Sequence, residues 1–464
     1  MPTAGSAEPF AHEIGGTVAN YATIVGTGGT AVSLAASFTN RMVIGAGAVF
    51  TGVVDGGNTI GSATISTLEL TTGASAGEVG TLSGIGSKYI DFGNMVVDAG
   101  ASWVLAGGQT IAANVTLTDN GTLTNNATVL TTVTLGSGAS LTNASDGVIR
   151  QINGGYGVLA LSPGSVTNYG AILGGPAGYG VEIAGGAVTN HAGTISGGWG
   201  VLISGTRGTV TNYVQIVGSV SEAGVGLATG GVIINRSGTI SGGDGTDVFE
   251  GGTVVNFATI LGINNNYAAA FFAAGYQNLL EIAPRSTIVG QANGGNTIGA
   301  TSVSTLELTT GTAAGVVGTV GVIGTLGEIG AQYVNFADIV VDPGASWAFK
   351  ATQTLAANET LTDNGTPTNN GTVLTLVTLG AGATLINAQG AQISDSAFTF
   401  AYAVRDSGVG VVVNDGLIAG GAHDGASGFT AAEPSPTSRT GRSPRHRIPG
   451  RQFSTLPERS STMA

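Results

Sequence analysis

The amino-acid sequence predicts an all-β fold, a right-handed parallel β-helix (β-solenoid) with coils of about 22 residues. Three observations carry this prediction. They are the composition, a short unit that recurs about every 22 residues, and a longer module that occurs twice.

The composition suits strands and turns and is poor for helices. Glycine supplies 81 of the 464 residues, and 9% of the residues are charged. Val, Ile and Thr favour strands and Gly and Asn favour turns, whereas Gly, Thr, Asn and Val all rank low in helix propensity. A chain of this length exceeds one ordinary globular core. A repeat protein escapes that limit because each coil buries apolar surface against its neighbours.

The short unit contains a Val-Thr-Asn strand, a turn and a second strand that ends near an isoleucine. Its asparagines, spaced by 22, 22, 23 and 21 residues, are Asn168, Asn190, Asn212, Asn235 and Asn256. Related units occur at Val18–Ile24 and Val413–Ile418, and glycine-led strands such as Gly180–Ile183 lie between the copies. Because a unit this small cannot bury its own apolar face, we expect stacked coils with parallel strands about 4.8 Å apart. The crossover rule predicts right-handed winding.

The repeated asparagine has a physical role in such a stack. Asn tolerates the left-handed backbone conformation at a turn, and its amide can hydrogen-bond to the Asn of the next coil. The competing interpretation is that Asn is a common turn residue. The near-constant spacing favours an asparagine ladder.

A longer module, module A, is duplicated around these repeats. Gly56–Gly61 and Ser66–Gly73 recur as Gly294–Gly299 and Ser304–Gly311 at an offset of 238. After a six-residue insertion, the offset becomes 244, and it relates Val97–Trp103 to Val341–Trp347 and Thr116–Thr122 to Thr360–Thr366.

These patterns divide the chain into six segments. They are N-terminal coils or a cap (1–39), module A (40–150), the 22-residue repeats (151–265), the module A duplicate (266–395), the last coils (396–424) and a tail (425–464). If about 420 residues form coils of about 22 residues, the solenoid has roughly 19 coils.

The two ends of the chain differ from the repeats. Residues 433–464 hold five prolines and six of the 14 Lys and Arg residues, so we expect a disordered C-terminal tail over 425–464. A frameshifted reading of the gene is the alternative explanation of this tail. Residues 1–10 show no basic region followed by an apolar one, so an export signal is not visible. We therefore expect either a fragment of a longer protein or another export route.

The charge balance and residue usage exclude several classes of partner and site. A net charge of −13 argues against a nucleic-acid partner, which would require a basic stripe. The absence of cysteine excludes disulfides and cysteine-ligated metals. No apolar run reaches the 18 residues of a membrane span, so we expect no transmembrane segment.

The repeats resemble the Gly/Thr/Asn-rich passenger domains of bacterial autotransporters and related β-helical adhesins of Gram-negative bacteria. The resemblance covers about residues 20–420, and the Thr-Asn-(Tyr/His) units and the Leu-Glu-Leu-Thr-Thr-Gly segments carry it. It implies a secreted or surface-displayed structural scaffold at the outer cell surface, with host, matrix or cell-surface glycans or proteins as partners. From the residues themselves, we also expect that the protein is not an enzyme. Members of this family usually carry an export signal and a C-terminal β-barrel or processing domain, and this sequence shows neither.

One segment suggests a metal site. Gly242–Glu250 fits the nonapeptide of calcium-binding β-rolls, and Asp244 and Asp247 would supply the hard oxygen ligands that Ca²⁺ prefers. Those sites form between successive stacked nonapeptides, whereas this sequence has a single copy. An ordinary turn is therefore the competing interpretation, and Ca²⁺ is the one cofactor that the sequence suggests.

A β-helical carbohydrate-active enzyme, a polysaccharide lyase or hydrolase, is one alternative to a scaffold, and a truncated, non-functional fragment of a longer gene is the other. Such an enzyme would need three or more clustered, non-repeated acids and a base. Asp98 and Asp119 recur at the duplicated positions of Asp342 and Asp363, which favours turns over an active site, and we nominate no catalytic residue.

Two further residue patterns predict packing. His191 replaces Tyr169 and Tyr213 at its repeat position, so we expect it to be a spacer in an aromatic or turn row. Trp103 and Trp347 also stand at equivalent positions, and we expect packing in the core or at an edge instead of sugar stacking.

Overall fold

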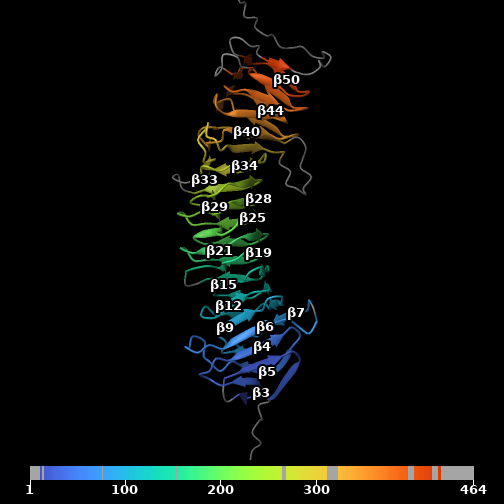
Figure 1. Cartoon of the computed structure of the whole chain (residues 1–464), viewed down its shortest axis with the longest axis vertical. Helices are drawn as coiled ribbons and strands as arrows, with labels where there is room; N and C mark the ends of the chain where they lie inside the picture. The colour runs from blue at the N-terminus through green and yellow to red at the C-terminus, as the bar shows by residue number, and fades with distance from the viewer. Residues whose placement is uncertain are drawn as a thin grey trace, which may run out of the picture. The chain divides into compact units, whose positions relative to one another are not determined.

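The computed structural model describes residues 11–12, 15–75, 77–151, 154–263, 268–310, 322–395, 402–420 and 427–429. These residues form a parallel β-solenoid of about 16 turns with about 23 residues per turn, which confirms the predicted fold class. Figure 1 shows the strands stacked in chain order, from β3 (Thr23–Leu34) to β50 (Val411–Asn414). None of the described residues forms a helix long and apolar enough to span a membrane.

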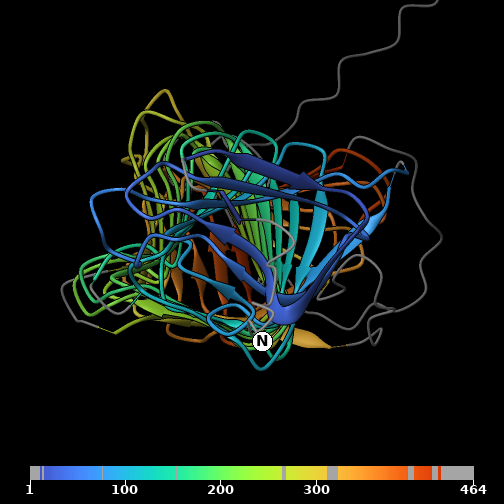
Figure 2. The same ribbon diagram turned by 90° about the horizontal axis from the view of Figure 1, so that it is seen from below.

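The strands lie on three faces, because each strand pairs with the third strand before it and the third after it along most of the chain. Figure 2 views this stack along its length. A 14-stranded sheet and then a 4-stranded sheet form face 1. A 16-stranded sheet forms face 2, and three shorter sheets in succession form face 3.

The strands of face 1 are β2 (Thr17–Asn20), β4 (Arg41–Gly45), β6 (Thr67–Thr71), β9 (Asn94–Val97), β12 (Thr116–Asp119), β15 (Val133–Leu135), β18 (Val158–Ala160), β21 (Tyr179–Ile183), β24 (Trp199–Ile203), β27 (Val225–Leu227), β30 (Thr246–Val248), β33 (Ala268–Phe272), β36 (Gln291–Asn293), β39 (Tyr333–Val334), β42 (Thr354–Leu355), β45 (Thr372–Val373), β48 (Gln392–Ser394) and β51 (Leu417–Ala419). The strands of face 2 are β7 (Val79–Leu82), β10 (Ser102–Leu105), β13 (Thr122–Asn125), β16 (Ser140–Asn143), β19 (Gly164–Asn168), β22 (Gly186–Asn190), β25 (Gly208–Asn212), β28 (Gly231–Asn235), β31 (Gly252–Asn256), β34 (Asn278–Ile282), β37 (Ser304–Leu308), β40 (Asp338–Val341), β43 (Thr360–Asp363), β46 (Val377–Leu379), β49 (Val404–Asp406) and β52 (Ser427–Phe429). The strands of face 3 are β1 (Ala11–His12), β3, β5 (Val49–Asp55), β8 (Tyr89–Ile90), β11 (Thr110–Ile111), β14 (Thr128–Val129), β17 (Val148–Arg150), β20 (Ala171–Leu173), β23 (Thr194–Ser196), β26 (Gln215–Val217), β29 (Thr239–Gly242), β32 (Thr259–Gly262), β35 (Thr287–Val289), β38 (Ile323–Leu326), β41 (Ser346–Phe349), β44 (Thr366–Asn369), β47 (Thr384–Asn387) and β50.

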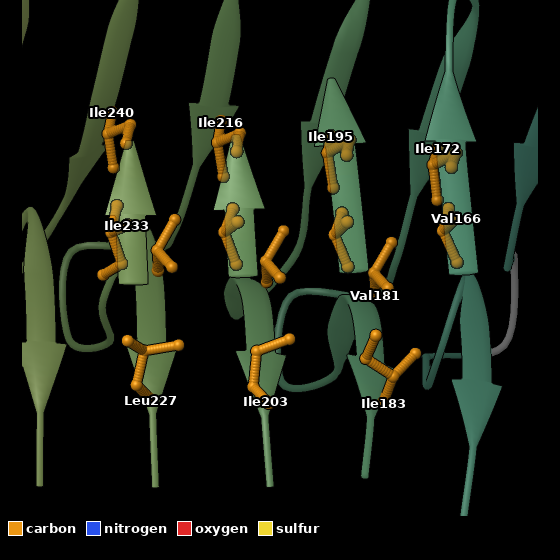
Figure 3. Packing of buried hydrophobic residues seen from close by; sticks show 14 of the residues in the cluster. Val166, Ile172, Val181, Ile183, Ile195, Ile203, Ile216, Leu227, Ile233 and Ile240 are labelled. Carbon is orange, nitrogen blue, oxygen red and sulfur yellow. The ribbon is translucent and has the colours of Figure 1, made fainter. Parts of the chain in front are cut away.

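The core is a set of aliphatic rows that run through successive coils. Along each strand, alternate residues point inward; in β22, Val188 and Asn190 are buried while Thr189 between them is partly exposed. Figure 3 shows one such row on face 3, in which every member is fully buried: Ile172, Ile195, Ile216 and Ile240. Burial of each such side chain stabilises the fold by about 1.5–3 kcal/mol.

The predicted asparagine ladder is present and lies inside the solenoid on face 2. Its seven members end strands β13 to β31 and are fully buried: Asn125, Asn143, Asn168, Asn190, Asn212, Asn235 and Asn256. Six hydrogen bonds join them, each donated by the Nδ2 of one Asn to the Oδ1 of the next at 2.9–3.0 Å. The expected left-handed backbone is wrong, because none of these residues has a positive φ. The turn that follows takes its positive φ from glycine instead, as at Gly193 and Gly238.

The duplicate of module A is advanced by one face relative to the first copy. Strand β6 lies on face 1, whereas its duplicate, β37, lies on face 2. The two are 31 strands apart, which is ten turns of three strands and one strand more. A second asparagine ladder follows the same shift: Asn369 and Asn387, the duplicates of Asn125 and Asn143, bond to each other at 2.9 Å on face 3.

Two details of the predicted organisation differ from the structure. The turns number about 16 and not 19, because excursions at the corners, such as 56–66 and 294–303, lengthen the coils of both module copies. Strand β52 continues face 2 beyond the predicted end of the coils at residue 424. The remainder of the predicted tail, 430–464, lies outside the described residues.

Candidate binding groove

A groove of about 1430 Å³ runs along face 2, and we call it the face 2 groove. One outward-facing side chain from each of seven successive strands, β25 to β43, forms its floor: Thr209, Val232, Thr253, Leu279, Thr305, Asp338 and Thr360. At about 4.8 Å per strand, the floor extends for about 29 Å. The groove therefore offers an elongated surface, suited to a ligand that is itself extended.

The wall of the groove comes from the corner segments between faces 1 and 2. Arg207 stands at one end, where its Nη2 donates to the carbonyl oxygen of Gly251 at 2.7 Å, and the ring of Tyr276 is 40% exposed further along. Glycine is required at Gly231, which has a φ of 134° and where a Cβ would lie 2.2 Å from the carbonyl oxygen of Gly208. The corners thus stack closely and leave the floor open.

Acidic side chains gather toward the other end of the groove. Glu307 lines it, and Glu281 on the neighbouring strand lies directly in register with Glu307. Burial, the interaction with the carboxyl of Asp342 and the charge of Glu281 together raise the pKa of Glu307 to about 7. Burial and the charge of Asp342 also raise the pKa of Glu281. This end of the groove therefore favours either a proton or a cationic ligand.

The structure brings the two calcium candidates together. Asp244 and Asp247 interact side chain to side chain, and the Asp244 carboxylate accepts a hydrogen bond from the backbone N–H of Ala268. Burial, with the charges of Asp244 and Glu222, raises the pKa of Asp247 to about 8. Because the pKa of Asp247 is raised, Ca²⁺ would have to displace a proton to bind there. Within the described part of the chain, no group of three or more His, Asp or Glu side chains is placed to hold a metal.

The duplicated acids Asp119 and Asp363 end strands β12 and β43, and both are fully buried. Each accepts a hydrogen bond from the backbone N–H two residues later, Gly121 at 2.9 Å and Gly365 at 2.8 Å, so these residues shape corners as predicted. Burial raises the pKa of each carboxyl to about 7.

The aromatic patterns also have structural roles. His191 is stacked between Tyr169 and Tyr213, with ring centroids 5.0 Å apart on either side, which confirms the predicted row. Trp103 and Trp347 are 3% and 2% exposed, as expected for core packing. Their indole N–H groups donate at 3.0 Å to the carbonyl oxygens of Thr71 and Thr309.

Sequence reasoning missed the face 2 groove, because its floor residues come from seven coils and include no motif. The sequence nevertheless contained a signal, because the second copy of module A is more negatively charged than the first at equivalent positions. No family model matches this chain, and comparisons with curated proteins and with solved structures found no match.

Proposed function

We propose that this protein is a secreted or surface-displayed scaffold of the adhesin type, which presents the face 2 groove to a partner molecule. The observation that carries the proposal is the continuity of this groove across seven coils of one sheet. Stacked repeats form long, regular surfaces on which binding is distributed along the stack. The buried core rows and the asparagine ladder would keep the strands of such a surface in register.

The charge and composition support the same proposal. The net charge of −13 keeps a rod of neutral Thr, Gly and Asn residues soluble and disfavours nucleic-acid partners. The groove contributes hydroxyls, one exposed tyrosine and a few charges, a mixture that suits a protein or glycan partner at a cell surface.

Surface proteolysis of intact cells tests this proposal. The protein should be cleaved by added protease before lysis, while a periplasmic and a cytoplasmic marker in the same cells stay intact. Cleavage that begins only after lysis would contradict a displayed scaffold.

A carbohydrate-active enzyme is the alternative function, and the charged residues in one groove are the observation that bears on it. The described lining contains Glu307, Asp338 and Arg207. Arg207 adjoins β25, but its guanidinium bonds to the Gly251 carbonyl beside β31, two strands from Glu307 on β37, so roughly 10 Å of floor separates the two charged groups. The described lining holds two acids, fewer than the three that we expect of such an enzyme. Release of sugar products that is lost in Glu307→Gln would favour the enzyme.

A further inference from the structure

The two copies of module A carry the same glutamate in two different settings. In the first copy, Arg41 on β4 binds Glu69 on β6 in bidentate fashion, with Nε donating to Oε2 and Nη2 to Oε1. Bidentate pairing of this kind fixes a guanidinium firmly in place. The first copy thus shows how a glutamate at this position binds an arginine of the adjacent parallel strand.

In the second copy the arginine is missing. Glu307 is the duplicate of Glu69, and the strand register places Leu279 where Arg41 stands in the first copy. Two further positions change in the same direction. Glu281 replaces Val43, and Asp338 replaces Asn94. All three differences make the second site more negative, and none supplies a compensating cation at these positions.

In the second copy, the positions equivalent to the arginine–glutamate pair line an open groove. Leu279, Thr305 and Glu307, the equivalents of Arg41, Thr67 and Glu69, all line the face 2 groove. Moreover, Glu281 and Glu307 stand directly opposite each other, and like charges in that position destabilise a sheet. A cation held between groove and glutamates would relieve this repulsion.

We propose that the face 2 groove binds an extended, arginine-bearing segment of a partner protein, whose guanidinium Glu307 holds as Glu69 holds Arg41. This inference names the class of partner for the function proposed above, and it rests on that function because a partner protein must be able to reach face 2. The floor of about 29 Å matches an extended peptide of about nine residues. A peptide also supplies backbone N–H and C=O groups for the Thr209, Thr253 and Thr305 hydroxyls along the floor.

Binding of a synthetic peptide to the purified chain tests the inference. The probe is a short blocked peptide of threonine and glycine with one central arginine, and its control carries citrulline, which is neutral and nearly isosteric. We expect titration calorimetry at low salt to show binding of the arginine peptide and at least tenfold weaker binding of the citrulline peptide, since a charged hydrogen-bonding pair is lost.

Three variants locate the binding site. Glu307→Gln should weaken the arginine peptide at least tenfold, and Leu279→Arg, which restores the internal arginine, should abolish its binding. Glu69→Gln is the matched control in the first copy and should bind as the unaltered protein does. Circular dichroism verifies that each variant is folded. If Leu279→Arg does not fold, the near-isosteric Glu307→Gln still decides the test.

Several results would overturn the inference. They are no binding of the arginine peptide, equal binding of the citrulline peptide, or full binding by folded Glu307→Gln. Self-association that Leu279→Arg abolishes would also overturn it, by assigning the groove to a second copy of this chain. Peptide binding by purified protein does not depend on where cells place the protein, so failure here and failure of the display experiment are distinguishable.

Discussion

The asparagine ladder makes a quantitative prediction about an interior rung. Asn190→Ala removes three hydrogen bonds: Asn168 Nδ2 to Asn190 Oδ1 at 2.9 Å, Asn190 Nδ2 to Asn212 Oδ1 at 3.0 Å, and Asn190 Nδ2 to the Gln215 carbonyl at 2.9 Å. At about 1 kcal/mol each, this loss is about 3 kcal/mol, while Asn168 Nδ2 and Asn212 Oδ1 keep their other hydrogen bonds, to the Gly170 carbonyl and from the Val214 N–H.

The assay must respect the repeat architecture, in which neighbouring coils can unfold separately. Urea titration monitored by circular dichroism gives the free energy of unfolding, and hydrogen exchange of the β22 and β25 amides localises the loss. Thr189→Ala is the matched control, because Thr189 lies on the same strand and points outward. We expect a cost below about 1 kcal/mol for the control. If Asn190→Ala and Thr189→Ala cost the same, the ladder does not stabilise the solenoid.

Three other perturbations test separate parts of the account. Buried Asp119 has a pKa of about 7, so the folded state keeps a proton that the unfolded state releases near pH 4, and stability should fall as pH rises from about 4 to 7. The Asp119→Asn variant should have a melting temperature that changes less over that interval. A wild-type melting temperature that rises with pH would contradict this. A Cβ at Gly80 would lie 2.6 Å from the Trp103 ring, so Gly80→Ala should lower the free energy of unfolding by about 1–3 kcal/mol. In the control Gly107→Ala, the nearest atom to the new Cβ is 3.4 Å away, so the loss should be under about 1 kcal/mol. Equal urea midpoints for the two variants would refute the packing argument. If Ca²⁺ displaces a proton from Asp247 and binds beside Asp244, millimolar Ca²⁺ should raise the melting temperature of the wild type but not of Asp247→Asn, and an unchanged wild-type curve would rule out the calcium site predicted from the sequence.

Much of the fold followed from spacing in the sequence. A recurrence of 21–23 residues between asparagines implies stacked coils, and fixed stacking brings Asn168 and Asn190 into hydrogen-bonding contact. The stacked position of His191 followed in the same way, because its repeat position is held by tyrosine in the adjacent coils. These predictions succeeded because each depends on a single repeat spacing that can be read directly from the sequence.

Other features depend on quantities that the repeat spacing does not contain. The number of turns depends on how far each corner loops outward, as at 56–66, and sequence similarity alone does not reveal that length. The advance of module A by one face depends on counting strands around the coil, so the placement of Glu307 in a groove required coordinates. The pairing of Arg41 with Glu69 is likewise diagonal across two strands, and the sequence gives no direct signal for it.

The most direct test of the central claim, that Glu307 in the second module A copy is the counterpart of Glu69 without its arginine, is a pair of double-mutant cycles on stability. One cycle combines Leu279→Arg with Glu307→Gln, and the other combines Arg41→Leu with Glu69→Gln. We predict a favourable coupling of about 1 kcal/mol between arginine and glutamate in both cycles, since the two sites share one strand register. A coupling in the first copy with none in the second would contradict the claim that Glu307 stands ready to receive a guanidinium.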